Sequence, residues 1–123
     1  MQVIKVVHAP LERVWDVLSD TRQWPVWGPS VCHVDCPQRY ISSGLQGRIK
    51  TAVGLWVRFE ITNCEAPVFW DWKVSGFAAT GHRLKKLTEN SCELILELPT
   101  MAFPYALICR WAANRIAHLA LEK

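Results

Sequence analysis

Few side chains in this sequence could carry acid–base chemistry. The candidates that could move a proton or stabilise a charge from an interior position are His33, His82, Glu60, Asp71, Tyr105 and Arg58. Neighbouring residues of a strand point to opposite faces of its sheet, so alternation separates these candidates. Phe59 and Trp70 are expected to face inward. Their chain neighbours Arg58, Glu60 and Asp71 then face solvent.

Of the three remaining candidates, two are expected in the interior, and the direction of His33 stays open. Thr80, His82 and Leu84 share one strand face, which we take as the inner one, and Tyr105 lies on the apolar stripe of a C-terminal helix. We therefore predict His82 and Tyr105 as the catalytic residues. A lone buried histidine also fits a hydrogen-bonded core residue, and that interpretation stays open.

Seven tryptophans are many for this chain, and large rigid rings suit both cores and pocket walls. We expect Trp15 in the core, whereas Trp24, Trp27 and Trp72 either contact a ligand or pack. The predicted ligand-binding set combines inward-facing aromatic and aliphatic side chains: Trp24, Trp27, Phe59, Trp70, Trp72, Leu94, Tyr105 and Ile108. If the strand parity is reversed, the face with Trp56 would form the site instead.

Recognisable motifs for metals, cofactors and nucleophiles are absent from the sequence. Cys32 and Cys36 flank His33, but zinc sites usually bring two close-spaced pairs, and no second pair exists. The sequence contains no nucleophile elbow, phosphate loop, dinucleotide fingerprint or HExxH. We expect no metal and no cofactor.

The cysteine count points to a reducing compartment. Five cysteines, an odd number with irregular spacing, favour free and buried thiols. The N-terminal residues show no signal-peptide pattern, so we expect a cytoplasmic protein.

Length and composition exclude several classes of protein. The chain has 123 residues, of which 50% are hydrophobic and 20% charged, which excludes disorder and predicts one domain over residues 1–123. The longest uncharged apolar run, residues 98–109, is well short of the roughly 20 residues that span a bilayer. A net charge of +3, scattered along the chain, argues against nucleic-acid binding.

The elements that must position these side chains can be predicted from periodicity. Residues 2–7 form a strand, and Leu11, Val14, Trp15 and Leu18 mark one face of a short helix that begins near Pro10. Asp20 and Gln23 resemble a capping box that opens a second short helix.

Six strands follow, at residues 31–36, 46–53, 55–64, 68–75, 79–88 and 92–98. Alternation is clearest at Leu55, Val57, Phe59 and Ile61, and at Cys92, Leu94, Leu96 and Leu98.

A long helix over residues 103–121 ends the chain. Its apolar stripe contains Tyr105, Ile108, Cys109, Ala112, Ile116 and Leu119. The order of elements predicts an α+β fold, in which a curved antiparallel sheet of about seven strands wraps around this helix, with two short helices after the first strand. Such a sheet tends to enclose a cavity.

Residues 8–31, HAPLERVWDVLSDTRQWPVWGPSV, resemble the opening of the SRPBCC, or START-like, superfamily. The resemblance is carried by Ala9-Pro10, Val14-Trp15, Asp20, Trp24 and Trp27, and residues 65–76, EAPVFWDWKVSG, are similar to a later strand-turn-strand stretch. It implies the helix-grip fold of lipid-transfer START domains, the birch pollen allergen and bacterial polyketide cyclase/dehydrases. The chain is short for that family, which implies a small cavity.

Three functions fit this resemblance. The first is binding of a hydrophobic, aromatic or polyketide-like molecule, with His82 or Tyr105 moving a proton during cyclisation and dehydration. The second is non-catalytic carriage or sensing of a lipid or isoprenoid. The third is an interaction module with a filled cavity, in which Trp111 and Leu107, on the polar side of the last helix, form a homodimer surface.

Overall fold

The computed structural model describes residues 2–28, 30–98 and 103–122, with the side chains of 103–109 and 122 excepted. Its elements in chain order are β1 (Gln2–Val7), α1 (Leu11–Ser19), α2 (Trp24–Trp27), β2 (Val31–Asp35), β3 (Gln46–Thr51), β4 (Trp56–Glu65), β5 (Phe69–Val74), β6 (Phe77–Thr88), β7 (Ser91–Glu97) and α3 (Phe103–Glu122). Tyr105, Leu107, Ile108 and Cys109, named above from the sequence, have side chains outside this description.

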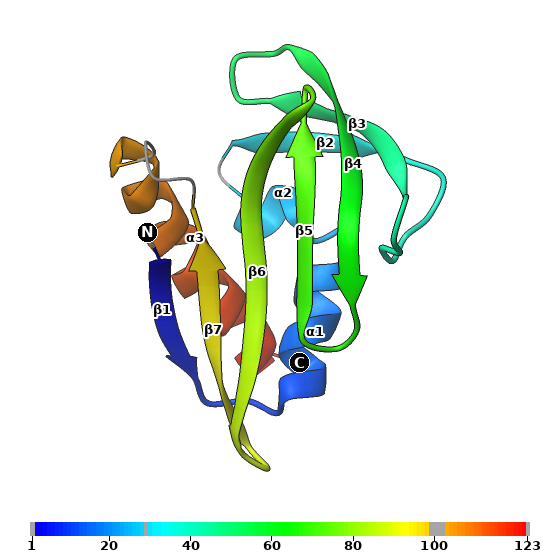
Figure 1. Cartoon of the computed structure of the whole chain (residues 1–123). Helices are drawn as coiled ribbons and strands as arrows, with labels where there is room; N and C mark the ends of the chain where they lie inside the picture. The colour runs from blue at the N-terminus through cyan, green and yellow to red at the C-terminus, as the bar shows by residue number, and fades with distance from the viewer. Residues whose placement is uncertain (1, 29, 99–102, 123) are drawn as a thin grey trace.

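The strands form one antiparallel sheet of seven strands in the order β1-β7-β6-β5-β4-β3-β2. The sheet curves, and all three helices lie on the same side of it (Figure 1). Helix α3 packs against β1 and β7 and also contacts α1 and α2. The predicted helix-grip arrangement is thus confirmed.

Strand alternation determines which face of the sheet is buried. On β7, Cys92, Leu94 and Leu96 are buried, while the residues between them are only half-buried. Leu94 pairs with Leu84 of β6, and Leu96 pairs with His82, so the buried face continues across the two strands.

The rotation of α3 also agrees with its sequence pattern. Ala112, Ile116 and Ala120 are buried against the sheet and α1, whereas Asn114 and His118 are exposed. In α1, Val14, Val17 and Leu18 are buried, as a period near 3.6 residues requires. Trp15 differs from the prediction, because it is half-buried and packs at the margin of the core.

The predicted capping box at Asp20 is wrong. Helix α2 begins at Trp24, and Asp20 lies in the turn before it, where one carboxylate oxygen accepts the backbone N–H of Arg22 at 3.0 Å. The other oxygen accepts two bonds from Arg39, from Nε at 3.2 Å and from Nη2 at 3.0 Å. The fully buried carboxylate therefore holds the long β2–β3 connection against the helical corner.

Two further expectations need correction. Leu55 does not share the buried face of Phe59 and Ile61, because the chain reverses there and leaves the side chain exposed. The cysteines are not uniformly buried. Cys92 is buried, Cys36 and Cys64 are half-buried and Cys32 is exposed, and these four are free thiols.

Candidate functional site

Six rings meet beneath the concave face of the sheet, and we call them the aromatic cluster. Its members come from α2, β4, β5 and β6 and are Trp24, Trp27, Phe59, Trp70, Trp72 and His82. Alternation brings the strand members to the inner face, and the corner between α1 and α2 brings the two helical tryptophans over them. The sequence predicted the inward direction of every member.

The centre of the aromatic cluster is a stack of three rings. The imidazole of His82 lies on the indole of Trp70, with centroids 3.8 Å apart and planes 11° apart. Trp24 stacks on Trp70 with a centroid distance of 5.3 Å and an angle of 10°. Trp72 meets all three edge-on, at 5.6 Å from Trp70, 6.4 Å from His82 and 5.3 Å from Trp24. Edge-to-face and offset contacts are the favourable geometries for such rings.

The indole N–H groups divide the tryptophans into two kinds. Trp24 donates through Nε1 to the Leu18 carbonyl at 3.1 Å, and Trp27 donates to the Val17 carbonyl at 3.2 Å. Those bonds join α2 to the end of α1 and make both rings part of the scaffold. The Nε1 atoms of Trp70 and Trp72 are also buried, but neither has a hydrogen-bond partner among the described residues.

His82 is neutral in this environment. A carbonyl oxygen can only accept, so the 3.3 Å contact between His82 Nδ1 and the Trp70 carbonyl places the hydrogen on Nδ1. Burial lowers the pKa of His82 from 6.5 to about 3, against a smaller opposing effect of that hydrogen bond. A general base works best with a pKa near the operating pH, so this imidazole is a weak base. Its chemical capacity at neutral pH is hydrogen bonding rather than proton transfer.

The other predicted site residues fall in three places. Phe59, Trp70 and Leu94 are buried on the inner face, and Trp72 is half-buried beside them. Tyr105 and Ile108 lie outside the described side chains. Arg58 is exposed, as the strand parity requires. His33 is exposed on β2, where the register shifts after the buried Val31.

Strand parity correctly separates the acidic and basic candidates from the interior. Asp71 lies on the outer side, where it accepts hydrogen bonds from Thr62 at 2.6 Å and from Asn63 at 2.9 Å. Glu60 pairs in register with Lys73 and Gln46, away from the rings. The sequence carried no signal for the two unpartnered indole N–H groups, because the loss of partners depends on which rings surround them.

Cavities of about 390 and 400 Å³ open on the surface, and Phe59 is the one member of the aromatic cluster that borders either of them. Among the described residues no three His, Cys, Asp or Glu side chains gather as a metal site would require. The described helices also lack a stretch long and apolar enough to cross a membrane.

Comparison with known proteins assigns this architecture. Residues 1–113 match the family model for polyketide cyclase / dehydrase and lipid transport. The Zhui aromatase/cyclase from Streptomyces sp. R1128 has a TM-score of 0.76 at 14% identity, covering 98% of this chain and 92% of that chain. The di-domain ARO/CYC StfQ from the steffimycin biosynthetic pathway gives 0.73 at 17% identity, covering 98% and 44%.

A plant enzyme has the same fold. The truncated norcoclaurine synthase from Thalictrum flavum gives a TM-score of 0.68 at 11% identity, covering 100% of this chain and 93% of that chain. At these identities the structural likeness establishes the fold alone and does not identify a ligand. No curated protein sequence matches the chain.

Proposed function

The chain belongs to the polyketide cyclase / dehydrase and lipid transport family, and on that premise we propose that it binds a hydrophobic, aromatic small molecule against the aromatic cluster. The ligand would lie between the concave face of the sheet and α3, in contact with Trp70 and Trp72. Phe59 and Leu94 would extend the apolar wall. Tyr105 and Ile108 stay predictions from the sequence.

The observation that carries this proposal is the pair of unpartnered indole donors. Trp70 Nε1 and Trp72 Nε1 are buried and have no hydrogen-bond partner among the described residues. A buried donor without a partner costs about 1–3 kcal/mol, and a ligand oxygen placed beside it would recover that cost. Stacked rings favour an aromatic body, and two donors favour carbonyl oxygens on it. An aromatic ketone or a poly-β-ketone has both features.

The proposed ligand-bound site orients its ligand more than it moves protons. A pKa of about 3 leaves His82 uncharged at neutral pH, with Nδ1–H directed to the Trp70 carbonyl. Its Nε2 lone pair can accept a hydrogen bond from an enol or phenol. If the protein cyclises its ligand, the acceleration would come from holding a reactive conformer in a water-poor site, which needs few catalytic groups.

Non-catalytic carriage is the second candidate, and the low pKa of His82 favours it. A carrier needs a binding site of suitable shape with apolar walls, and it needs no group that titrates. The neutral imidazole of His82, stacked on the indole of Trp70, meets this requirement. The third hypothesis, a filled interior, receives support from the mutual packing of Trp24, Trp70 and His82.

The test is a tryptophan-fluorescence titration with two matched probes, 2-acetonaphthone and naphthalene, together with native mass spectrometry of the purified protein. The proposal expects saturable quenching by both, with the ketone binding about tenfold tighter because it alone offers an acceptor to the indole N–H groups. Equal affinities would refute the role of the indole donors. Absence of saturable binding, with no co-purified ligand, would favour the filled interior.

A further inference from the structure

Two hairpin turns at one end of the sheet present apolar side chains to solvent. The three most exposed large hydrophobic residues of the described chain are Val53 at 81%, Phe77 at 78% and Leu55 at 64%. Val53 and Leu55 lie in the β3–β4 turn, and Phe77 is the first residue of β6, directly after the β5–β6 turn. We call them the hairpin tips. Gly54 and Gly76 in the same turns have φ of +86° and +81°, so the backbone folds tightly and projects its neighbours outward.

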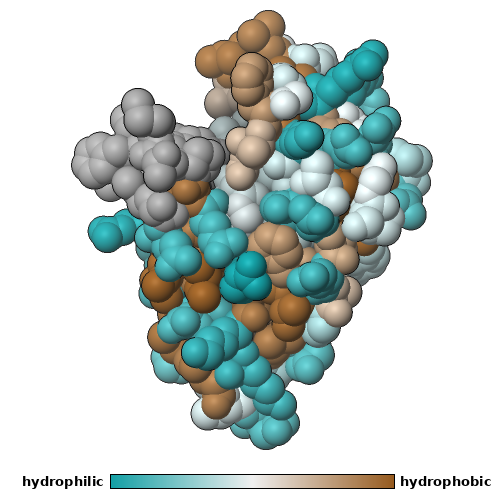
Figure 2. Space-filling model, viewed as in Figure 1, coloured by the Kyte–Doolittle hydropathy of each residue, from teal (hydrophilic) through white to brown (hydrophobic). Residues whose placement is uncertain are grey.

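The hairpin tips belong to one surface. Both turns lie at the same end of the sheet (Figure 1), and the N–H of Ser75 in the second turn donates to the carbonyl of Arg58 on β4 at 2.9 Å. Figure 2 shows hydrophobic side chains gathered over this end of the molecule, with hydrophilic ones beside them. Solvent-exposed apolar clusters of this kind mark interaction sites.

Cationic side chains lie directly behind the hairpin tips. A cavity of about 390 Å³ on this part of the sheet is bordered by Arg48, Arg58 and Lys73, and also by Gly76 of the second turn. Its one acidic neighbour is Glu60. Over the described residues, neither Arg58 nor Lys73 takes part in an ion pair.

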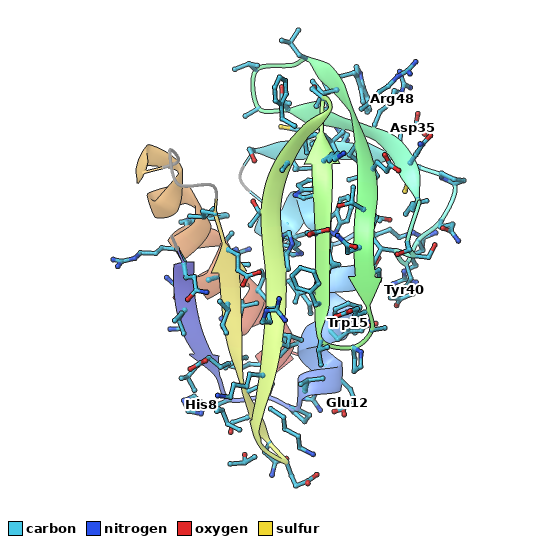
Figure 3. The ribbon with its side chains drawn as sticks, viewed as in Figure 1. His8, Glu12, Trp15, Asp35, Tyr40 and Arg48 are labelled. Atoms are coloured by element: carbon cyan, nitrogen blue, oxygen red, sulfur yellow. The ribbon has the colours of Figure 1, made fainter. Side chains whose placement is uncertain are left out.

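Arg48 differs from the other two cations. Its Nη2 donates to Asp35 at 2.7 Å on the outer side of the sheet, where Figure 3 shows the two side chains together. Its guanidinium also lies over the half-exposed ring of Trp56, 5.0 Å from the centroid. Tryptophan and arginine are typical of the boundary between apolar and aqueous phases, because each has an apolar body and a polar end.

We infer that this end of the sheet docks on the surface of an anionic lipid bilayer, with the hairpin tips in the interface and the cations at the phosphate groups. Leu55 is the residue before β4 and precedes Arg58 by three residues, so at about 3.3 Å per residue of extended chain the two are at most about 10 Å apart. Interfacial apolar groups enter a membrane by about 5–10 Å, so the spacing matches. A fluid interface closes around separate protruding side chains and needs no preformed groove.

The proposal is independent of the ligand proposed above and is tested on the ligand-free protein. The measurement is co-sedimentation with phosphatidylcholine vesicles, with and without phosphatidylglycerol. We expect binding to the anionic vesicles, weakening as salt is raised. Equal binding to neutral vesicles, or none to anionic ones, would overturn the inference.

Two sets of variants locate the surface. Replacing both Arg58 and Lys73 by Gln should weaken vesicle binding by about fivefold per cation removed. Replacing Val53, Leu55 and Phe77 together by Ser should weaken it at least about tenfold, since each loses apolar area from the interface. These positions are exposed, and circular dichroism checks that each variant is folded.

Matched controls come from elsewhere on the surface. Leu87 and Leu121 are also exposed aliphatic residues, and changing both to Ser should leave vesicle binding unchanged. A loss in this variant equal to that of the hairpin tips would mean that binding is nonspecific. Trp72→Leu should bind vesicles like the wild type, so a failure of ligand binding is distinguishable from a failure of docking.

Discussion

The imidazole of His82 lies flat on the indole of Trp70, and its Nδ1–H donates to the backbone carbonyl of the same tryptophan. The two residues are register partners on β6 and β5, so the strand pairing itself fixes both contacts. Because the ring is buried, the neutral form is strongly preferred, and the pKa falls to about 3 even though the hydrogen bond to the Trp70 carbonyl acts in the opposite direction.

This pKa makes the stability of the protein depend on pH. Unfolding returns the pKa of His82 to about 6.5, so between pH 6.5 and 3 the unfolded chain binds a proton that the folded chain does not. The free energy of unfolding should fall by about 1.4 kcal/mol for each pH unit below 6.5 and should not change through this group above that pH.

The variant His82→Gln isolates the contribution of this one histidine, because glutamine does not titrate. Urea unfolding of the wild type and of His82→Gln at pH 7.5, 6 and 5 should give curves that converge as the pH falls. Parallel pH dependence in the two proteins would show that His82 keeps an ordinary pKa.

Trp72 is the ring at which ligand binding should be most sensitive. It is half-buried at the edge of the aromatic cluster and contributes one of the two unpartnered N–H groups. Trp72→Leu should weaken binding of 2-acetonaphthone by about tenfold, because the ring contact and the donor are both lost. Retention of full affinity, measured by fluorescence titration, would place the ligand elsewhere.

Trp15 provides the matched control for that change. It is also a half-buried tryptophan, but it lies on α1 outside the aromatic cluster. Trp15→Leu should leave the affinity for the ketone unchanged. An equal loss of affinity in both variants would indicate a general loosening of the core rather than a local contact.

The Asp20–Arg39 pair should stabilise the fold far more than the Arg48–Asp35 pair. Asp20 is fully buried and accepts three hydrogen bonds, whereas both partners of the second pair are exposed. Asp20→Asn should lower the free energy of unfolding by about 2–3 kcal/mol, and Asp35→Asn by less than about 1 kcal/mol. Urea unfolding measures both, and equal effects would contradict the assigned role of Asp20.

Trp111 tests whether α3 forms a surface between copies of the chain. The ring is 48% exposed, and the guanidinium of Arg115 lies 5.7 Å from its centroid. Trp111→Ala should change the unfolding free energy by less than about 1 kcal/mol while weakening any homodimer. Sedimentation over a concentration series decides this, since a monomer in both proteins removes the dimer hypothesis.

Much of the fold was determined by the sequence alone. The apolar side of β7 is indicated by the alternation at Cys92, Leu94 and Leu96. The apolar side of α3 is indicated by the stripe at Ala112 and Ile116. An apolar face must be buried whatever its neighbours are, so the curved sheet, its closing helix and the inward direction of His82 could all be predicted.

The tertiary structure alone decided which inward-facing groups meet. Periodicity gives the side of a residue but not its partner, so the stack of His82 on Trp70 depends on strand register and on the corner that delivers Trp24. The same limit explains Asp20, whose partner Arg39 is distant in sequence, and Leu55, whose alternation continues into a turn. The burial of a side chain, its pKa and the absence of a hydrogen-bond partner all depend on the residues around it. Those residues come together only when the chain folds.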